Sequence, residues 1–159
     1  MMRPSPEFAN SVLILTSATL FWVAFTDFRQ FKIRNELVLV LVGLFLLHSV
    51  VSGRWIEIHW HIGLAAVMLA GMLYYYSQGL MGGGDVKLLA VAFLWTGPWA
   101  ALPFAILLLI FVGVHVLAAR VGWAVVQRNE MGKQRIPLAP AIAAALIGTF
   151  MLGFLKPIG

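Results

Sequence analysis

The chain has 159 residues, of which 62% are hydrophobic and only 11% are charged. Soluble domains carry about 25% charged and about 45–50% apolar residues, so this composition excludes an ordinary soluble globule. It also excludes intrinsic disorder, because disordered chains are poor in apolar residues. The class that remains is an integral membrane protein with little mass outside the bilayer. The absence of cysteine excludes disulfides, thiol nucleophiles and cysteine-based metal sites.

Apolar stretches predict membrane helices over residues 8–26, 37–51, 60–76 and 137–155. A spanning helix needs about 20 mainly apolar residues. The apolar segment 86–121 is too long for one helix and slightly short for two, and the Gly97–Pro98 pair is its natural break. We therefore expect a short fourth helix over 86–95 and a long fifth helix over 100–121.

The predicted fold class is therefore all-α, a polytopic membrane helix bundle with six transmembrane helices. The chain contains no internal repeat and no linker, so residues 1–159 are expected to form a single domain. The fourth helix is too short to cross a bilayer of about 30 Å. It must be buried among its neighbours or lie where the membrane thins.

The basic residues predict the orientation of the chain, since the cytoplasmic loops of membrane proteins are enriched in Lys and Arg. With six spans, the segments 27–36, 77–87 and 120–136 share one side of the membrane. They contain most of the eleven basic residues: Arg29, Lys32, Arg34, Lys87, Arg120, Arg128, Lys133 and Arg135. We expect this side to be cytoplasmic and both termini to lie outside. The formal net charge of +5 then reflects orientation, and no nucleic-acid partner is predicted.

Asp27 and Asp85 are the only aspartates in the chain, and each stands at the predicted cytoplasmic end of a helix. An ionisable residue at the edge of a span is energetically costly and therefore points to a function. Two carboxylates held close together share a proton, so one can activate a water while the other donates a proton to a carbonyl oxygen. A purely structural role stays open for each residue. Asp85 could cap the fourth helix, and Asp27 could pair with Arg29 or Lys32 at the surface.

Three glycines, Gly82, Gly83 and Gly84, immediately precede Asp85. They allow another segment to approach the backbone closely, although a flexible turn between helices is the alternative. The sequence around them lacks the pattern of a phosphate-binding loop. Lys87 follows Asp85, and we expect it to be an interfacial cation or to contact a lipid phosphate or a carboxylate.

The histidines give little evidence for a metal site. His59 and His61 are expected outside the membrane, and two histidines without an H-E-x-x-H pattern do not predict a metal ion. His48 and His115 lie within predicted helices, where a histidine that bonds inside the bundle is expected. The sequence therefore predicts neither a metal nor a cofactor.

Three segments carry a resemblance to a known family. The run GGGDVKLLA, which contains Asp85, resembles the G-x-G-D motif of the type IV prepilin peptidases, which are aspartic proteases at the membrane boundary. Asp27, with the basic stretch that follows it to Ile33 and Asn35, resembles the first catalytic aspartate of that family. The run IPLAPAIA at 136–143 resembles the motif that opens its last helix. The resemblance extends over residues 20–145.

The resemblance implies a membrane endopeptidase that removes the basic leader from pilin-like precursors at the cytoplasmic face of a bacterial inner membrane. Asp27 and Asp85 are then the catalytic pair, and the three glycines and Lys87 support the motif. The implied partners are the precursor protein and the lipid bilayer. Longer members of the family add a methyltransferase region with paired cysteines. This chain has no cysteine and is similar to the short, peptidase-only members that serve tight-adherence (Flp-type) pili.

The chain departs from the family pattern at three positions. Arg34 stands where a proline is common, and Leu138 and Ala139 stand where an aromatic residue and a glycine are common. None of these positions is an acid, so the departures bear on substrate fit more than on catalysis.

Two functions of other classes compete with the peptidase. Paired membrane acids also serve proton relays, so a small proton-coupled transporter subunit is one alternative. Such transporters favour acids near the middle of the membrane and inverted repeats, and the sequence shows neither. A non-catalytic assembly factor for a pilus or secretion system is the other alternative.

Overall fold

The structure is a computed structural model that describes residues 6–30, 33–53, 55–121, 127–128, 134–135 and 138–153. In this part of the chain, five α-helices account for almost all of the regular structure: α1 (Pro6–Gln30), α2 (Asn35–Val51), α3 (Ile58–Ser77), α4 (Gly83–Arg120) and α5 (Ala139–Met151). A 3₁₀ turn, Trp55–Glu57, precedes α3, and two short antiparallel strands, β1 (Gln127–Arg128) and β2 (Gln134–Arg135), pair between α4 and α5. The predicted all-α class is confirmed.

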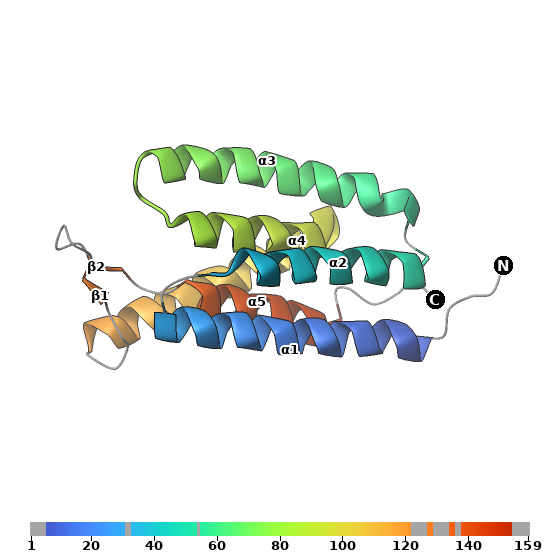
Figure 1. Ribbon diagram of the computed structural model, residues 1–159, viewed down its shortest axis with the longest axis horizontal. Coiled ribbons are helices and arrows are strands. Elements are labelled where there is room, and N and C mark those ends of the chain that lie inside the picture. The colour runs from blue at the N-terminus through green and yellow to red at the C-terminus, as the bar shows by residue number, and fades with distance from the viewer. Residues whose placement is uncertain are drawn as a thin grey trace.

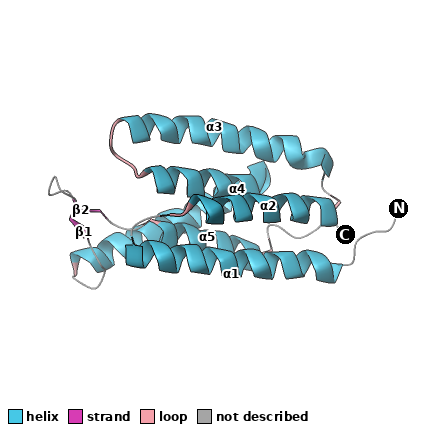
Figure 2. Cartoon of the chain, in the orientation of Figure 1, coloured by secondary structure: helices cyan, strands magenta, loops and turns pink. Residues whose placement is uncertain are grey.

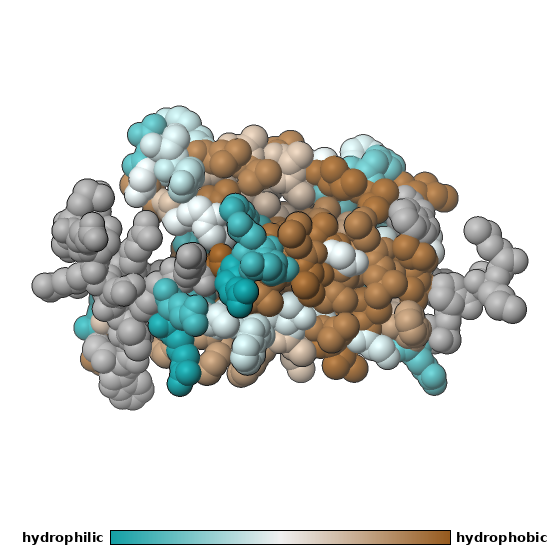
Figure 3. All heavy atoms as spheres, viewed as in Figure 1, coloured by the Kyte–Doolittle hydropathy of each residue, from teal (hydrophilic) through white to brown (hydrophobic). Residues whose placement is uncertain are grey.

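Three of these helices are long and apolar enough to cross a membrane, over Glu7–Gln30, Ile58–Ser77 and Gly83–Arg120, while α2 and α5 are apolar but shorter. Large apolar side chains such as Ile14, Val67 and Leu109 are each about 70% exposed. Water would make this exposure unfavourable, whereas lipid favours it. Figure 3 shows a broad apolar surface that extends from the centre to the right of the view, with hydrophilic residues gathered near the centre, at the left and at the right-hand corners. The chain is an integral membrane protein.

The helices pack around α4 and α5, which form the centre of the bundle. Helix α5 lies against both α1 and α4, α2 lies against α1 and α4, and α3 packs on α4 (Figure 1). The largest fully buried side chains come from α1, α2, α4 and α5, and include Trp95, Phe104, Leu20, Leu41, Ile142 and Leu146. From α3, only His61 and Met72 are buried.

Helix α4 is interrupted at Gly97, which is the one residue within it that has a non-helical conformation (φ 57°, ψ −174°). Figure 1 shows the chain turning back at this kink, so that both ends of α4 lie at the end of the bundle where the α3–α4 loop lies. One residue is enough to turn the chain, so no loop separates the two helical segments. The predicted break is therefore found at Gly97, where two helical segments of α4 meet without a loop. Because α4 counts as one element, the described residues form five helices, and the predicted count of six is not confirmed.

The segment of α4 that precedes the kink is deeply buried. Its buried side chains are Val86, Leu88, Leu89, Val91, Ala92, Phe93, Trp95 and Thr96. After the kink, the buried positions end at Phe104. This difference fits the expectation that a short helical segment has to be enclosed by its neighbours.

His61 of α3 stabilises the kink. Pro98 has no backbone N–H, so the carbonyl of Leu94, four residues earlier, loses its helical partner. The Nδ1 atom of His61 lies 2.8 Å from that carbonyl oxygen and donates a hydrogen bond to it. The imidazole also fills the space beside Gly97, since a Cβ atom at residue 97 would lie 2.5 Å from Cε1 of His61. His61, which the sequence led us to expect outside the membrane, is thus buried against α4.

These contacts predict that Gly97→Ala destabilises the protein. The backbone conformation at Gly97 is open almost only to glycine and costs other residues about 1–3 kcal/mol, and the new methyl group would also clash with the imidazole. Gly113→Ala is the matched control, because that glycine also lies in α4 but a Cβ atom there would meet nothing within 4 Å. There we expect no loss, or a gain of up to about 1 kcal/mol. Thermal unfolding in detergent measures both, and equal melting temperatures for the two variants would contradict this account.

Candidate active site

The helix ends that carry the two aspartates lie at one end of the bundle. The last turn of α1, the first turns of α2 and α5, the last turn of α3 and both ends of α4 gather there (Figure 1). Figure 2 shows the α3–α4 loop and the connection leading into α2 at this same end. The segments predicted to share one side of the membrane, 27–36 and 77–87, therefore lie together. Much of the third segment, 120–136, lies outside the described residues.

Asp27 lies near the end of α1 and is buried, with only 5% of its surface exposed. Its Oδ2 atom accepts a hydrogen bond of 3.3 Å from the backbone N–H of Ala139. Ala139 is the first residue of α5, and the first N–H groups of a helix have no partner within that helix. The positive end of the helix dipole also favours a carboxylate at this position. Asp27 therefore joins α1 to the start of α5.

Of the two partners that the sequence suggests for Asp27, the structure describes only Arg29. The guanidinium of Arg29 lies over the ring of Phe25, 5.0 Å from its centroid. Lys32 lies outside the described residues. The environment of the Asp27 carboxylate is thus set by a backbone donor from a helix that is distant in sequence.

Asp85 lies in the first turn of α4 and is partly buried. The N-cap of α4 is Gly82, in an extended conformation, so Asp85 does not occupy the N-cap position that was its alternative role. Its carboxylate nevertheless reaches back to the N-cap, since a Cβ atom on Gly82 would lie 2.9 Å from Oδ2 of Asp85. An acid in the first turn interacts favourably with the helix dipole.

Each of the three glycines before Asp85 meets a different group. A Cβ atom on Gly83 would lie 3.3 Å from the ring of Tyr76, at the end of α3. A Cβ atom on Gly84 would lie 3.1 Å from Cβ of Ile33, in the connection between α1 and α2. Together with the contact of Gly82 to Asp85, these approaches make the glycine triplet a closely packed junction. Gly83 and Gly84 belong to the first turn of α4, so the triplet is more than a flexible turn.

Lys87 contacts a neighbouring helix. Its Nζ atom donates a hydrogen bond of 3.0 Å to Oδ1 of Asn35, the first residue of α2. Both side chains are exposed. The sequence predicts an interfacial cation or a contact with a lipid phosphate or a carboxylate, and in the structure this exposed lysine bonds to an amide oxygen.

These contacts place the two aspartates around one junction of helices. Helix α5 packs against α1 and α4, and its first residue bonds to Asp27. Ile33, which follows Asp27 in the chain, touches Gly84, which adjoins Asp85. At this end of the bundle Asp27 is thus buried and Asp85 is partly buried.

Sequence reasoning missed three features of this junction: the backbone donor at Ala139, the Lys87–Asn35 bond and the packing of Tyr76 on Gly83. The IPLAPAIA run, through its resemblance to a family motif, was the one signal that pointed to the start of α5. Residues 136 and 137 of that run lie outside the described residues. Arg34, one of the residues that depart from the family pattern, forms an exposed ion pair with Glu36, with 3.2 Å between Nε and Oε2. Leu138, another such residue, is the N-cap of α5.

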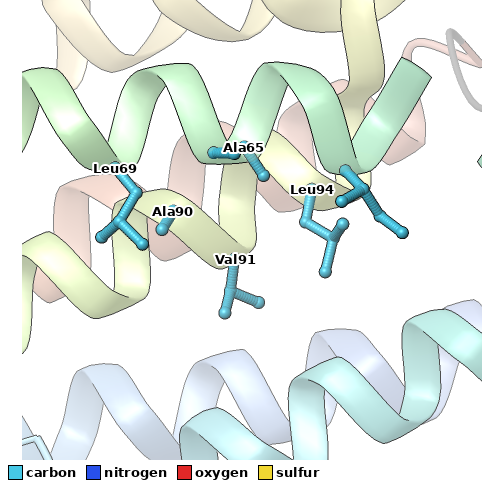
Figure 4. Close-up of a pocket in the computed structure, with 7 residues that line it drawn as sticks. Ala65, Leu69, Ala90, Val91 and Leu94 are labelled. Atoms are coloured by element: carbon cyan, nitrogen blue, oxygen red, sulfur yellow. The ribbon is translucent and has the colours of Figure 1, made fainter. Parts of the chain in front are cut away.

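An apolar groove of about 280 Å³ lies between α3 and α4, away from the acids (Figure 4). Alanines from both helices leave this space open, and it is lined by Ile62, Ala65, Ala66, Leu69, Ala90, Val91 and Leu94. None of these side chains can ionise, so the groove cannot supply acid–base chemistry. Within the described part of the chain, no group of three or more His, Asp or Glu side chains could hold a metal ion.

Comparison with known proteins gives one match. Residues 14–118 match the type IV leader peptidase family, a region that includes both aspartates and the glycine triplet. Searches of curated proteins and of solved structures returned no match.

The Ala139–Asp27 bond predicts that two substitutions of Asp27 differ in stability. Asp27→Asn keeps an oxygen that can accept from the Ala139 N–H, so we expect a change in unfolding free energy within about 1 kcal/mol. Asp27→Leu leaves this buried N–H without a partner and is expected to cost about 1–3 kcal/mol. Thermal unfolding in detergent tests this order.

Glu7 is the matched control, because it lies on the same helix but is exposed in its first turn. Glu7→Gln and Glu7→Leu are expected to change stability by no more than about 0.5 kcal/mol. If Asp27→Leu is as stable as Asp27→Asn, the hydrogen bond does not hold α1 to α5.

Proposed function

Because the chain belongs to the type IV leader peptidase family, we propose that it is an aspartic endopeptidase that uses Asp27 and Asp85 to cut the basic leader from pilin-like precursors. One observation carries the proposal. The only two aspartates of the chain lie at one polar end of a membrane bundle, around a junction built by α1, α4 and α5.

The chemistry needs one protonated and one ionised carboxyl group. The ionised carboxylate takes a proton from a water molecule, and the resulting hydroxide attacks the scissile carbonyl carbon. The protonated carboxyl donates its proton to the carbonyl oxygen as the tetrahedral intermediate forms. The carboxyl that took the proton from water donates it to the amide nitrogen, and the C–N bond breaks. A hydroxyl proton of the tetrahedral intermediate returns to the other carboxylate as the new carboxyl product forms, so the pair again holds one proton.

The position of the pair suits a substrate with a basic leader and an apolar helix. The apolar part of such a precursor favours the bilayer, and its charged leader favours water, so the bond between them lies at the membrane boundary. Both aspartates stand at helix ends beside hydrophilic segments, where that boundary is expected. The glycine triplet supports the site by letting Ile33 and Tyr76 pack against the start of α4.

The orientation that we propose puts this end of the bundle at the cytoplasmic face of a bacterial inner membrane, with both termini on the opposite side. Its support is the distribution of Lys and Arg, most of which fall in the segments that end there. We further propose an Flp-type precursor as substrate and cleavage without N-methylation. The chain has no cysteine, whereas the methyltransferase region of longer members of the family carries paired cysteines.

Co-expression with candidate pilin precursors tests the proposal, with cleavage read as a mobility shift on a gel. We expect Asp27→Asn and Asp85→Asn each to reduce cleavage by at least about 100-fold, because each removes one acid–base group. Glu7→Gln removes an acid from the other end of α1 and is expected to cleave like the unmodified chain.

Cleavage that persists in both Asn variants would refute the aspartic mechanism. If the chain carrying both substitutions still restores pilus assembly, the protein is an assembly factor and not a protease. Proton flux into proteoliposomes that is lost in Asp27→Asn would instead support a transporter.

A further inference from the structure

We propose that the Lys87–Asn35 hydrogen bond positions Asp85 relative to Asp27, so that Lys87 acts on the reaction through Asn35 and without touching the substrate. This inference rests on the proposed function and names two positioning residues for it. Lys87 follows Asp85 within the first turns of α4, and Asn35 begins α2, directly after the connection that leaves Asp27. The bond of 3.0 Å between their side chains therefore links the start of α4, which carries Asp85, to the start of α2, the helix that follows Asp27 and α1 in the chain.

A second contact lies beside this bond. Ile33 packs against Gly84, since a Cβ atom on that glycine would lie 3.1 Å from Cβ of Ile33. We refer to Ile33, Asn35, Gly84 and Lys87 as the α2–α4 seam. The seam combines an apolar contact at Gly84, the residue before Asp85, with a polar contact at Lys87, two residues after it. It therefore restrains the chain on both sides of Asp85.

Elsewhere, α2 and α4 are joined deep in the bundle, where Nε1 of Trp95 donates a hydrogen bond of 3.1 Å to the carbonyl of Leu41. That bond lies about three turns of α4 away from Asp85. It fixes the far end of the first segment of α4. At the end of α4 where Asp85 lies, Tyr76 of α3 packs on Gly83, and the seam supplies the contacts to the chain between α1 and α2 and to the start of α2.

The exposure of the Lys87–Asn35 bond separates its effect on stability from its effect on catalysis. An exposed polar contact contributes little to the free energy of unfolding. A shift of about 1 Å in a reacting group, in contrast, can cost about 100-fold in rate. Loss of the bond is therefore expected to lower kcat while the protein remains folded.

A double-mutant cycle tests the seam in the cleavage reaction. We expect Lys87→Ala and Asn35→Ala each to lower kcat about tenfold, with KM changed by less than about twofold. The doubly substituted chain is expected to be no slower than either single variant, because the two residues act through one bond. Lys87→Arg keeps a donor and is expected to retain most of the activity.

Arg120→Ala is the matched control, since it removes a cation from the same helix at the same end of the bundle and is expected to leave kcat unchanged. Three results would overturn the inference. They are additive losses in the cycle, a loss in Lys87→Ala that appears mainly in KM, and full activity in Lys87→Ala. The second would mean that Lys87 binds the precursor, and the third that it serves only as an interfacial cation.

A second measurement does not depend on cleavage. The chain has no cysteine, so Ile33→Cys and Gly84→Cys together introduce a single reactive pair at the seam. The Cβ atoms at these positions would lie 3.1 Å apart, so the two segments must separate by a few tenths of an ångström to reach the range of about 3.5–4.5 Å found in disulfides. We expect a mild oxidant to form this disulfide readily in membranes, which a maleimide–polyethylene glycol shift reports as a loss of free thiols.

Adding Lys87→Ala to the cysteine pair is expected to slow disulfide formation about tenfold, while Lys87→Arg and Arg120→Ala leave the rate unchanged. If the disulfide forms at the same rate with Lys87 and with Lys87→Ala, the inference is overturned, and this result does not depend on whether the chain cleaves a precursor. If the unmodified chain cleaves no precursor, the proposed function fails, and the cross-linking rates still decide whether the seam holds the start of α4.

Discussion

Every backbone polar group that a helix leaves unpaired inside an apolar bundle must find a partner, because no water is available there. This constraint operates at two places in the structure. The kink at Gly97 and Pro98 frees the carbonyl of Leu94, and the start of α5 presents the N–H of Ala139. His61 from α3 donates to the first group, and Asp27 from α1 accepts from the second. In both cases a polar side chain from another helix forms a hydrogen bond with an unpaired backbone group at a helix end or break. This bond fixes how the two helices pack.

The two completed bonds have different consequences for function. The kink turns α4 back, so that its buried first segment brings Asp85 to the same end of the bundle as the end of α1. The bond at Ala139 holds α5 between α1 and α4 and keeps the Asp27 carboxylate in a buried position. The two aspartates are therefore located by backbone hydrogen bonding as much as by their own helices. Changes at Gly97 are expected to act on folding, whereas changes at Asp27 act on both packing and chemistry.

The sequence predicted the helices well because apolar length is a local property. The stretches 8–26, 37–51 and 60–76 lie within α1, α2 and α3, and the break in the fourth apolar segment was located at the correct dipeptide. Composition cannot distinguish a loop from a kink of one residue, so the predicted six helices appear as five in the described part of the chain.

The contacts of the candidate site were harder to predict because they join distant residues. The partner of Asp27 is a backbone N–H, which any residue type except proline offers. The sequence placed His61 outside the membrane because of its neighbours in the chain, whereas its hydrogen bond is to the carbonyl of Leu94 in another helix, α4. A local pattern identifies unusual residues, but only the packed helices show which of them meet.

The glycine triplet shows how a short motif can follow from packing. A side chain at residue 84 would push Ile33 away, one at residue 83 would press on Tyr76, and one at residue 82 would displace the Asp85 carboxylate. Each of these shifts would move the start of α4 relative to the segment that follows Asp27. Glycine at these positions therefore lets the neighbouring segments approach the start of α4 more closely than a larger residue would. Their close packing, rather than their flexibility, explains why the acid of α4 follows them directly.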